Sequence, residues 1–334
     1  MIPYRPTRAI DPFVLAPPLA AAAYPFLLML FHDVVGPSGT QVSGAGMLAA
    51  TVVLMCALLV PVFGIVVAWR VRLRAGMRRL AYASVAAPSL YVFLGVVQAL
   101  IGSTIPDPWV WCVMWLGATL WAWRSDRTAP RPAALPALGR WRVAHGIVAA
   151  NVSLYILFHL GNHLMGLSGP AAHAAVMDAG RTVYWARLIE PLLVLAFLFQ
   201  VGSGLHLAWH WSAQRHGFFR TFQIASGVCL SVFIVGHMNS VFIYARMYLG
   251  IPTDWDFATG APTGLIHDPW NIRLLPHYAL GVFFVLGHLV AGLRVVLEAH
   301  GMQRDTVDRL WCAGVVGSAV IATAIVAGMC GLRI

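Results

Sequence analysis

Four consecutive apolar segments in the second half of the chain each carry a histidine within the segment. These residues are His159, His206, His237 and His288. A titratable side chain is costly to bury in hydrocarbon and is usually kept there for a function. Neutral imidazole is a common ligand of transition metals and of haem iron. Histidines on neighbouring apolar segments therefore predict a metal ion or a haem held between helices.

The segments that position these histidines are long enough to cross a membrane. The chain has 334 residues, of which 60% are hydrophobic and 10% are charged. Runs of about 20 apolar residues, the length that spans a bilayer as a helix, recur along it. The nine predicted spans are 13–33, 45–69, 80–102, 107–123, 143–167, 183–210, 221–247, 275–298 and 308–331. We expect an all-α, polytopic membrane protein in contact with lipid.

The spans fall into two groups. A stretch rich in Arg, Pro and Ala, residues 124–142, predicts a cytoplasmic linker between a four-helix half (1–123) and a five-helix bundle (143–334). Both halves contain Leu-Phe-His, ending at His32 and His159, and Asp-Pro-Trp, starting at Asp107 and Asp268. Because these matches occur in the same order, the first half is a candidate degenerate duplicate that has lost its ligands.

The orientation follows from the arginines, which gather at alternate loops. They precede the first span and follow the second, fourth, sixth and eighth: Arg5, Arg8, Arg70, Arg72, Arg74, Arg78, Arg79, Arg124, Arg127, Arg131, Arg140, Arg142, Arg215, Arg220, Arg304 and Arg309. The positive-inside rule then predicts a cytoplasmic N-terminus and an external C-terminus in the inner (cytoplasmic) membrane. The net charge of +10 is explained by these loops and does not indicate nucleic-acid binding.

Depth separates the histidines into two levels. At about 1.5 Å per residue, His159 and His237 lie in the outer halves of two outward-running spans and can face each other. His288 lies in the inner half of an inward-running span, at a level comparable with Gln200. His206 lies nearer the cytoplasm. The sequence thus predicts an outer histidine pair and an inner half-site.

Three spans of the second half carry motifs in matching register. The matching residues are Gln223, Gly227 and His237 in one span, Tyr278, His288, Gly292 and Leu293 in the next, and His145, Gly146 and His159 in the first span of this half. On these residues the region 140–334 resembles the five-helix cytochrome b subunit that anchors succinate dehydrogenase and fumarate reductase.

This resemblance implies a ligand set for haem b. Two-haem members of the family pair a ligand on the first helix with one on the third, and one on the second with one on the fourth. Carried over, His159 and His237 bind an outer haem, and His288 binds an inner haem whose partner position holds Gln200. His206, six residues further on, is turned away from the Gln200 face and serves only if the helix is shifted or rotated. One haem is favoured; two haems and none are the alternatives.

Other polar residues are candidates for supporting roles. His163 follows His159 by one turn and is a candidate partner for a haem propionate or a quinone oxygen. Arg246 is a candidate partner for propionates or a snorkelling arginine. Glu190, within an apolar span, is a candidate for an ion pair with Arg187 or for proton exchange with a quinone at the outer face.

Two other histidines, His145 and His277, lie near the ends of predicted spans, at the membrane interfaces. Their side chains are expected to be solvated. The external loop 250–273, which contains Pro, Gly, Trp and Asp, predicts a lid over a site at the outer face.

The preferred hypothesis is a membrane-embedded b-type haem protein that passes electrons between a partner and quinone. It would be the electron-transfer subunit of a quinone oxidoreductase of the succinate dehydrogenase or fumarate reductase type. The resemblance implies flavoprotein and iron–sulfur subunits docked on the cytoplasmic face. The alternative is a haem-free structural anchor, or a transporter that uses buried histidines and Glu190. The sequence has no His-Glu-x-x-His motif, so a zinc-protease site is not indicated.

Overall fold

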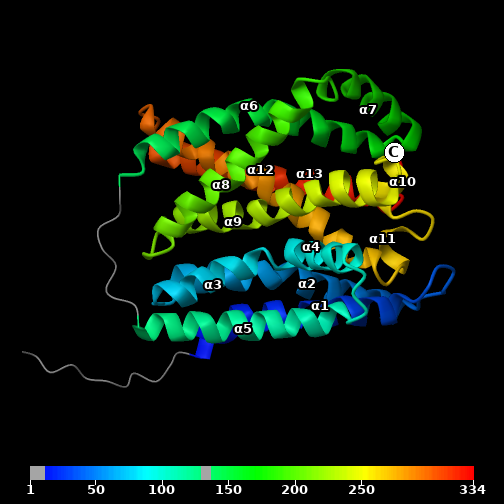
Figure 1. Cartoon of the computed structure of the whole chain (residues 1–334), viewed down its shortest axis with the longest axis horizontal. Helices are drawn as coiled ribbons and strands as arrows, with labels where there is room; N and C mark the ends of the chain where they lie inside the picture. The colour runs from blue at the N-terminus through cyan, green and yellow to red at the C-terminus, as the bar shows by residue number, and fades with distance from the viewer. Residues whose placement is uncertain (1–11, 129–136) are drawn as a thin grey trace, which may run out of the picture.

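The computed structural model describes residues 12–128 and 137–334, and within these ranges the regular structure is entirely helical (Figure 1). The helices are α1 (Ala16–Val35), α2 (Gly44–Arg70), α3 (Ala75–Val85), α4 (Ala87–Leu100), α5 (Asp107–Thr128), α6 (Gly139–Leu164), α7 (Pro170–Tyr184), α8 (Ile189–Trp211), α9 (Phe218–Met238), α10 (Trp255–Thr259), α11 (Gly264–His267), α12 (Leu274–Ala299) and α13 (Arg304–Met329). Short 3-10 turns cover Pro12–Leu15, Met165–Leu167 and Asn271–Arg273, and a π-helix, Asn239–Leu249, continues α9. Arg5, Arg8, Arg131 and the middle of the predicted linker lie outside the described residues.

Seven helices of the described residues are long and apolar enough to cross a membrane, and the bent pair α3 and α4 makes an eighth when it is counted as one span. The chain is therefore an integral membrane protein. The sequence predicts nine spans. The predicted span that is not among these eight, 107–123, corresponds to α5. This helix is 22 residues long, but tryptophans supply much of its apolar character, and their rings also suit a membrane interface.

The predicted span 80–102 is broken in the structure. Its two helices, α3 and α4, meet at 73°. Pro88 lies in the first turn of α4, where its missing N–H costs nothing, whereas the same residue inside one continuous helix would break a backbone hydrogen bond. The chain therefore ends one helix at Val85 and starts the next at Ala87.

The helices run along the long axis of the molecule and define two ends (Figure 1). The short helices α7, α10 and α11 and the C-terminus lie at one end, which we call the lid end. At the other, the linker end, α5 ends and α6 begins. α9 contacts α8 and α12 on one side and α3 and α4 on the other. The two halves of the chain consequently share one continuous hydrophobic core.

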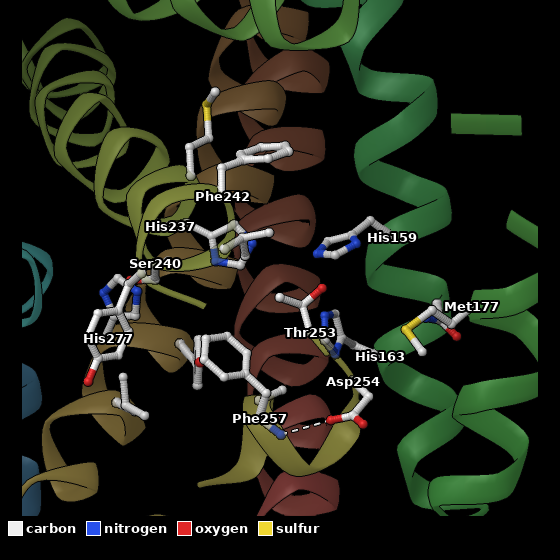
Figure 2. A pocket seen from close by; sticks show the side chains of 18 of the residues that line it. His159, His163, Met177, His237, Ser240, Phe242, Thr253, Asp254, Phe257 and His277 are labelled. Carbon is white, nitrogen blue, oxygen red and sulfur yellow. Dashed lines mark hydrogen bonds between the residues drawn. The ribbon is translucent and has the colours of Figure 1, made fainter. Parts of the chain in front are cut away.

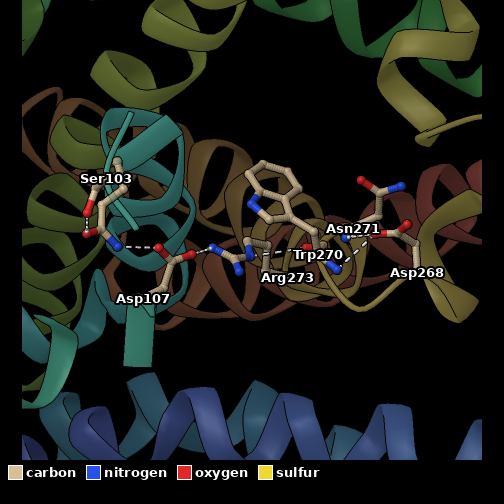
Figure 3. A network of polar contacts seen from close by, with 7 residues as sticks. Ser103, Asp107, Asp268, Trp270, Asn271 and Arg273 are labelled. Atoms are coloured by element: carbon tan, nitrogen blue, oxygen red, sulfur yellow. Dashed lines mark hydrogen bonds and ion pairs between the residues drawn. The ribbon is translucent and has the colours of Figure 1, made fainter. Parts of the chain in front are cut away.

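A buried ion pair also joins the halves at the lid end (Figure 3). Arg273, just before α12, contacts Asp107, the first residue of α5, with its Nη1 atom 2.5 Å from Oδ2. Gln98 donates to the other carboxylate oxygen of Asp107, and the Arg273 guanidinium lies over the ring of Tyr91. A Cβ atom on Gly95 would overlap the guanidinium, so glycine at this position leaves the room that Arg273 occupies.

The two Asp-Pro-Trp motifs both precede helical segments that enter this network. α5 begins at Asp107, and Oδ1 of Asp268 accepts hydrogen bonds from the backbone N–H groups of Trp270 and Asn271, at 2.8 Å each. An aspartate that caps free N–H groups at a helix start is a common arrangement. The aspartate of the second motif thus caps backbone groups, whereas that of the first binds Gln98 and Arg273.

Candidate functional site

A cavity of about 800 Å³ lies between α6, α7, α8, α9 and α12 at the lid end. Figure 2 shows several of its lining side chains directed into the space between the helices. Residues of the first half close one side, since Val92 and Val96 of α4 also line the cavity. Cavities of roughly 300–1,000 Å³ are typical of sites for small molecules and cofactors.

His159 of α6 and His237 of α9 face each other across this cavity (Figure 2). Their ring centroids are 6.1 Å apart and their ring planes are inclined at 69°. Neither ring makes a hydrogen bond to another described residue. Aromatic walls hold both rings, because Tyr155 stacks on His159 and Phe233 stacks on His237. The pair that matched depth predicts is thus brought together, with its nitrogens uncommitted.

The spacing of these rings suits a metal centre between them. A metal ion bonds an imidazole nitrogen at about 2.0–2.1 Å. Two imidazoles on opposite sides of one ion then hold their ring centroids roughly 6 Å apart, from that bond length and the size of the ring. The observed 6.1 Å agrees with this value. The donor set, the spacing and the adjoining cavity therefore fit a haem with two axial histidines.

Two further histidines extend the line toward the lid end. The ring of His163 lies 4.7 Å from that of His159, and the ring of His173, on α7, lies 5.2 Å from that of His163. Asn162 places its Nδ2 atom 3.3 Å from Nε2 of His173. The Nδ1 atoms of His163 and His173 are buried and have no partner among the described residues. These nitrogens can serve a polar group of a bound molecule.

The protonation state of His173 follows from its surroundings. Burial lowers the pKa of His173 below its usual value, and the nearby Arg181 charge lowers it further, while Asp254 opposes both effects. His173 is therefore neutral near pH 7. Because the amide nitrogen of Asn162 donates to Nε2, the ring proton resides on Nδ1. The unpartnered Nδ1–H group is a hydrogen-bond donor.

The sequence did not single out His173, because it lies outside the apolar spans. Its helix, α7, occupies part of a region expected to be a loop and the start of a span at residue 183. The structure instead starts the span at Ile189, after α7 and a turn. Gly169 followed by Pro170 at the first helical position was the available signal for this helix.

His277 was expected to be solvated, and this prediction was wrong. Its exposed fraction is 2%. Its ring lies 4.7 Å from the ring of Phe233, the side chain that stacks on His237. α12 begins at Leu274 and continues from a 3-10 turn, so His277 lies within the packed helix and not at a solvated end.

The loop predicted as a lid does line the cavity. Thr253, Asp254 and Phe257 contribute to its wall (Figure 2). α10 in this loop carries Trp255, which is 6% exposed and lies against His173. A Cβ atom on Gly166 would overlap the Trp255 ring, so glycine lets the lid approach the end of α6.

A π-helix follows His237 directly. It covers Asn239–Leu249, and its i→i+5 hydrogen bonds give a wider turn than an α-helix has. Ser240, Phe242 and Arg246 of this segment line the cavity. π-helical turns are rare and are frequent at functional sites. This segment therefore supplies part of the cavity wall directly after His237.

Arg246, not Arg187, is the ion-pair partner of Glu190. The Nη1 atom of Arg246 lies 2.8 Å from Oε1 of Glu190, and the guanidinium also lies over the ring of Trp185. Arg187 is exposed and forms no ion pair with a described residue. The predicted i,i+3 contact fails because α8 begins only at Ile189, so Arg187 belongs to the preceding turn.

This assignment predicts a difference between two arginine substitutions. Because both partners are about a third exposed, water screens the pair, and Arg246→Gln should lower the stability by about 0.5–1 kcal/mol. Arg187→Gln, the matched control, should leave stability unchanged. Apparent Tm values in detergent at one scan rate measure both. An equal loss in the two variants would contradict the pairing.

At the linker end, the predicted inner residues each contact other side chains or backbone groups. The amide nitrogen of Gln200 donates to the backbone oxygen of His145 at 2.9 Å, which ties α8 to α6. His206 lies beside Trp141 and His210, with ring centroids 4.9 and 4.8 Å away. His288 instead contacts Ser226 of α9 at 2.9 Å through Nδ1. The contacts of His206 are thus with Trp141 and His210, whereas those of Gln200 are with the start of α6.

No group of three or more His, Cys, Asp or Glu side chains in the described ranges is arranged to hold a metal ion. The two-histidine arrangement at His159 and His237 is the type that suits haem, whose macrocycle supplies the other four ligands. Comparison of the chain with protein-family models, curated proteins and solved structures found no match.

Proposed function

We propose that the protein is a membrane-embedded b-type cytochrome that passes electrons between a partner and a quinone. The observation that carries this proposal is the pair His159 and His237, 6.1 Å apart beside a cavity of about 800 Å³. Haem, when bound between these imidazoles, supplies one-electron redox chemistry. The resemblance of residues 140–334 to the cytochrome b anchor of succinate dehydrogenase and fumarate reductase supports the same role.

The chain's own residues would serve the cofactor and the substrate in distinct ways. His159 and His237 would hold the iron and set its potential through their basicity. Arg246 and Arg181 both line the cavity. They would offset the negative charge of the haem propionates. The neutral Nδ1–H donor of His173 would bond a quinone oxygen or an ordered water at the lid end. Glu190, which is paired with Arg246, would exchange a proton with the quinone there.

The membrane arrangement that goes with this role has nine crossings. α5 supports the ninth, because it contacts α1, α3 and α4 and its 22 residues exceed the 20 of α1, which is itself long and apolar enough to cross. An odd number of crossings places the two termini on opposite sides of the membrane. With arginines at the linker end facing the cytoplasm, the lid end would be external in the cytoplasmic membrane. Flavoprotein and iron–sulfur subunits would dock at the linker end.

The direct test is a reduced-minus-oxidised absorption spectrum of the purified full-length protein, expressed with a sufficient haem supply. We expect the α-band of a low-spin b-type haem, with at least one haem per chain by pyridine haemochromogen assay. Co-purified flavin and iron–sulfur subunits would support the complex. A folded chain that has no such band under these conditions would overturn the proposal and favour a haem-free anchor or transporter.

A further inference from the structure

A small cavity at the linker end is separate from the one that His159 and His237 line. Its volume is about 250 Å³, and its walls come from the first turns of α9 and the last turns of α12. None of its lining residues lines the larger cavity. The polar and charged side chains in its wall are Arg220, Gln223, Arg294 and Glu298. The proposed function assigns no task to any of them.

Two of the three charged side chains in this wall are neutralised. The Nη1 atom of Arg294 lies 3.1 Å from Oε2 of Glu298. Its Nη2 and Nε atoms lie 2.7 and 2.9 Å from Oδ1 of Asp308 on α13. The other carboxylate oxygen of Glu298 lies 2.9 Å from Nε of Arg304. Every guanidinium nitrogen of Arg294 and both oxygens of Glu298 thus have a partner of opposite charge.

Arg220 is the third charged side chain, and no carboxylate among the described residues pairs with it. Its Nη1 atom donates to the amide oxygen of Gln223 at 2.7 Å, and its guanidinium lies 4.5 Å from the ring centroid of Trp211. These neutral contacts hold the guanidinium in place but leave its charge uncompensated. The exposed Arg142, at the start of α6, adds a second positive charge that acts on Arg220.

The start of α9 adds hydrogen-bond donors to the same wall. Its N-cap is Gly217, which has no side chain to cap the first turn, and the N–H groups of a first turn have no partner within their helix. Such groups favour an anion. A fixed guanidinium beside them suits the oxygens of a phosphate group, which accept several charge-assisted hydrogen bonds at once.

The position of the cavity favours a lipid phosphate over a free phosphate. α9 and α12 are both long and apolar enough to cross a membrane, and the cavity lies where α9 begins and α12 ends. Leu293 and Val296, which directly precede and follow the lining residues Arg294 and Val295, are 54% and 51% exposed. Exposed apolar side chains on such a helix offer a surface for acyl chains. Basic pockets between membrane helices on the cytoplasmic side are typical sites for anionic headgroups.

We propose that this cavity binds the phosphate group of an anionic glycerophospholipid in the leaflet at the linker end, with Arg220 as its main contact. The acyl chains would follow Leu293 and Val296 along α12. Because the bound lipid would join the start of α9 to the end of α12, it should stabilise the folded chain. The site does not involve haem, so this proposal stands apart from the proposed function.

The test is lipid binding by the delipidated full-length protein in a non-ionic detergent, measured by native mass spectrometry with phosphatidylglycerol or phosphatidylcholine. We expect phosphatidylglycerol to bind more tightly than the zwitterionic lipid and to raise the apparent Tm. Arg220→Gln should weaken its binding about tenfold, because a hydrogen bond to a charged group is lost. Arg220→Lys, which keeps the charge, should retain most of the preference.

Arg309→Gln is the matched control. It removes the same charge from an exposed position on α13 that does not line the cavity, and it should bind phosphatidylglycerol as the unaltered protein does. Equal weakening in Arg309→Gln and Arg220→Gln would attribute the preference to the net charge of this end and overturn the site. Unchanged binding in Arg220→Gln would overturn it as well.

Two further outcomes need no variant that could fail to fold. If the unaltered protein binds both lipids equally, the proposal is wrong. Inorganic phosphate, added without lipid, distinguishes the other source of a phosphate group. A rise in the apparent Tm with inorganic phosphate but not with phosphatidylglycerol would identify a soluble phosphate compound as the ligand and overturn the lipid assignment.

Discussion

Replacing His237 with alanine is expected to abolish haem binding at the lid end, with a loss of one haem per chain. The physical reason is that His237 supplies one of two opposed imidazoles, and the ring of its partner His159 lies 6.1 Å away across the cavity. A single remaining axial ligand holds haem weakly and leaves it high-spin. The haem-to-protein ratio and the low-spin α-band of the purified variant measure the effect.

His277→Ala is the matched control for this experiment. His277 is also buried near the cavity and lies against Phe233, the residue that stacks on His237. Its truncation removes a similar volume from the same region but removes no proposed ligand. We expect this variant to keep its haem. Equal loss in both variants would attribute the effect to packing, and an unchanged spectrum in His237→Ala would refute the outer site.

The outer pair was accessible from the sequence because it depends on simple quantities. Helix direction and a fixed rise per residue place His159 and His237 at one depth, and depth is insensitive to small errors in span boundaries. The structure brings the two rings to a centroid separation of 6.1 Å across the cavity. Whether they bind haem is a chemical question that the spectrum answers.

Contacts that depend on helical phase were harder to predict. The sequence placed Glu190 opposite Arg187 by assuming a continuous α-helix, but α8 begins at Ile189. It also could not foresee that residues Asn239–Leu249 form a π-helix, whose wider turn rotates the residues that follow it. Arg246 reaches Glu190 from this segment. Local backbone geometry set by packing therefore decided the partner.

His145 illustrates a different reason for a missed residue. Its position near the end of a span suggested a solvated side chain, and side chains near span ends usually are solvated. In the structure its ring contacts Ser203 of α8. This helix begins at Ile189, 44 residues after His145 in the chain. A contact between distant segments has no signature in local composition. Only the packing of α6 against α8 reveals that this histidine is fixed.

The buried ion pair between Asp107 and Arg273 carries the second large prediction. The exposed fractions of the two side chains are 16% and 7%, so neither charge is well solvated. Asp107→Asn leaves the guanidinium of Arg273 buried without a counter-charge. Breaking a buried pair on one side typically costs about 3–5 kcal/mol, a large share of the roughly 5–15 kcal/mol that keeps a domain folded. We expect a large drop in the apparent Tm in detergent.

A double variant and a surface control make this prediction specific. Adding Arg273→Gln to Asp107→Asn removes the stranded charge, so the double variant should regain part of the lost stability, since a buried pair is costly mainly when one partner is missing. Asp33→Asn changes an exposed aspartate in the same half and should have little effect. Because Asp107 lies on α5 and Arg273 precedes α12, the loss also measures how strongly the two halves are coupled. A negligible change in the Tm of Asp107→Asn would show that the pair does not join the halves. So would simple additivity, in which the double variant loses the sum of the stabilities lost in Asp107→Asn and in Arg273→Gln.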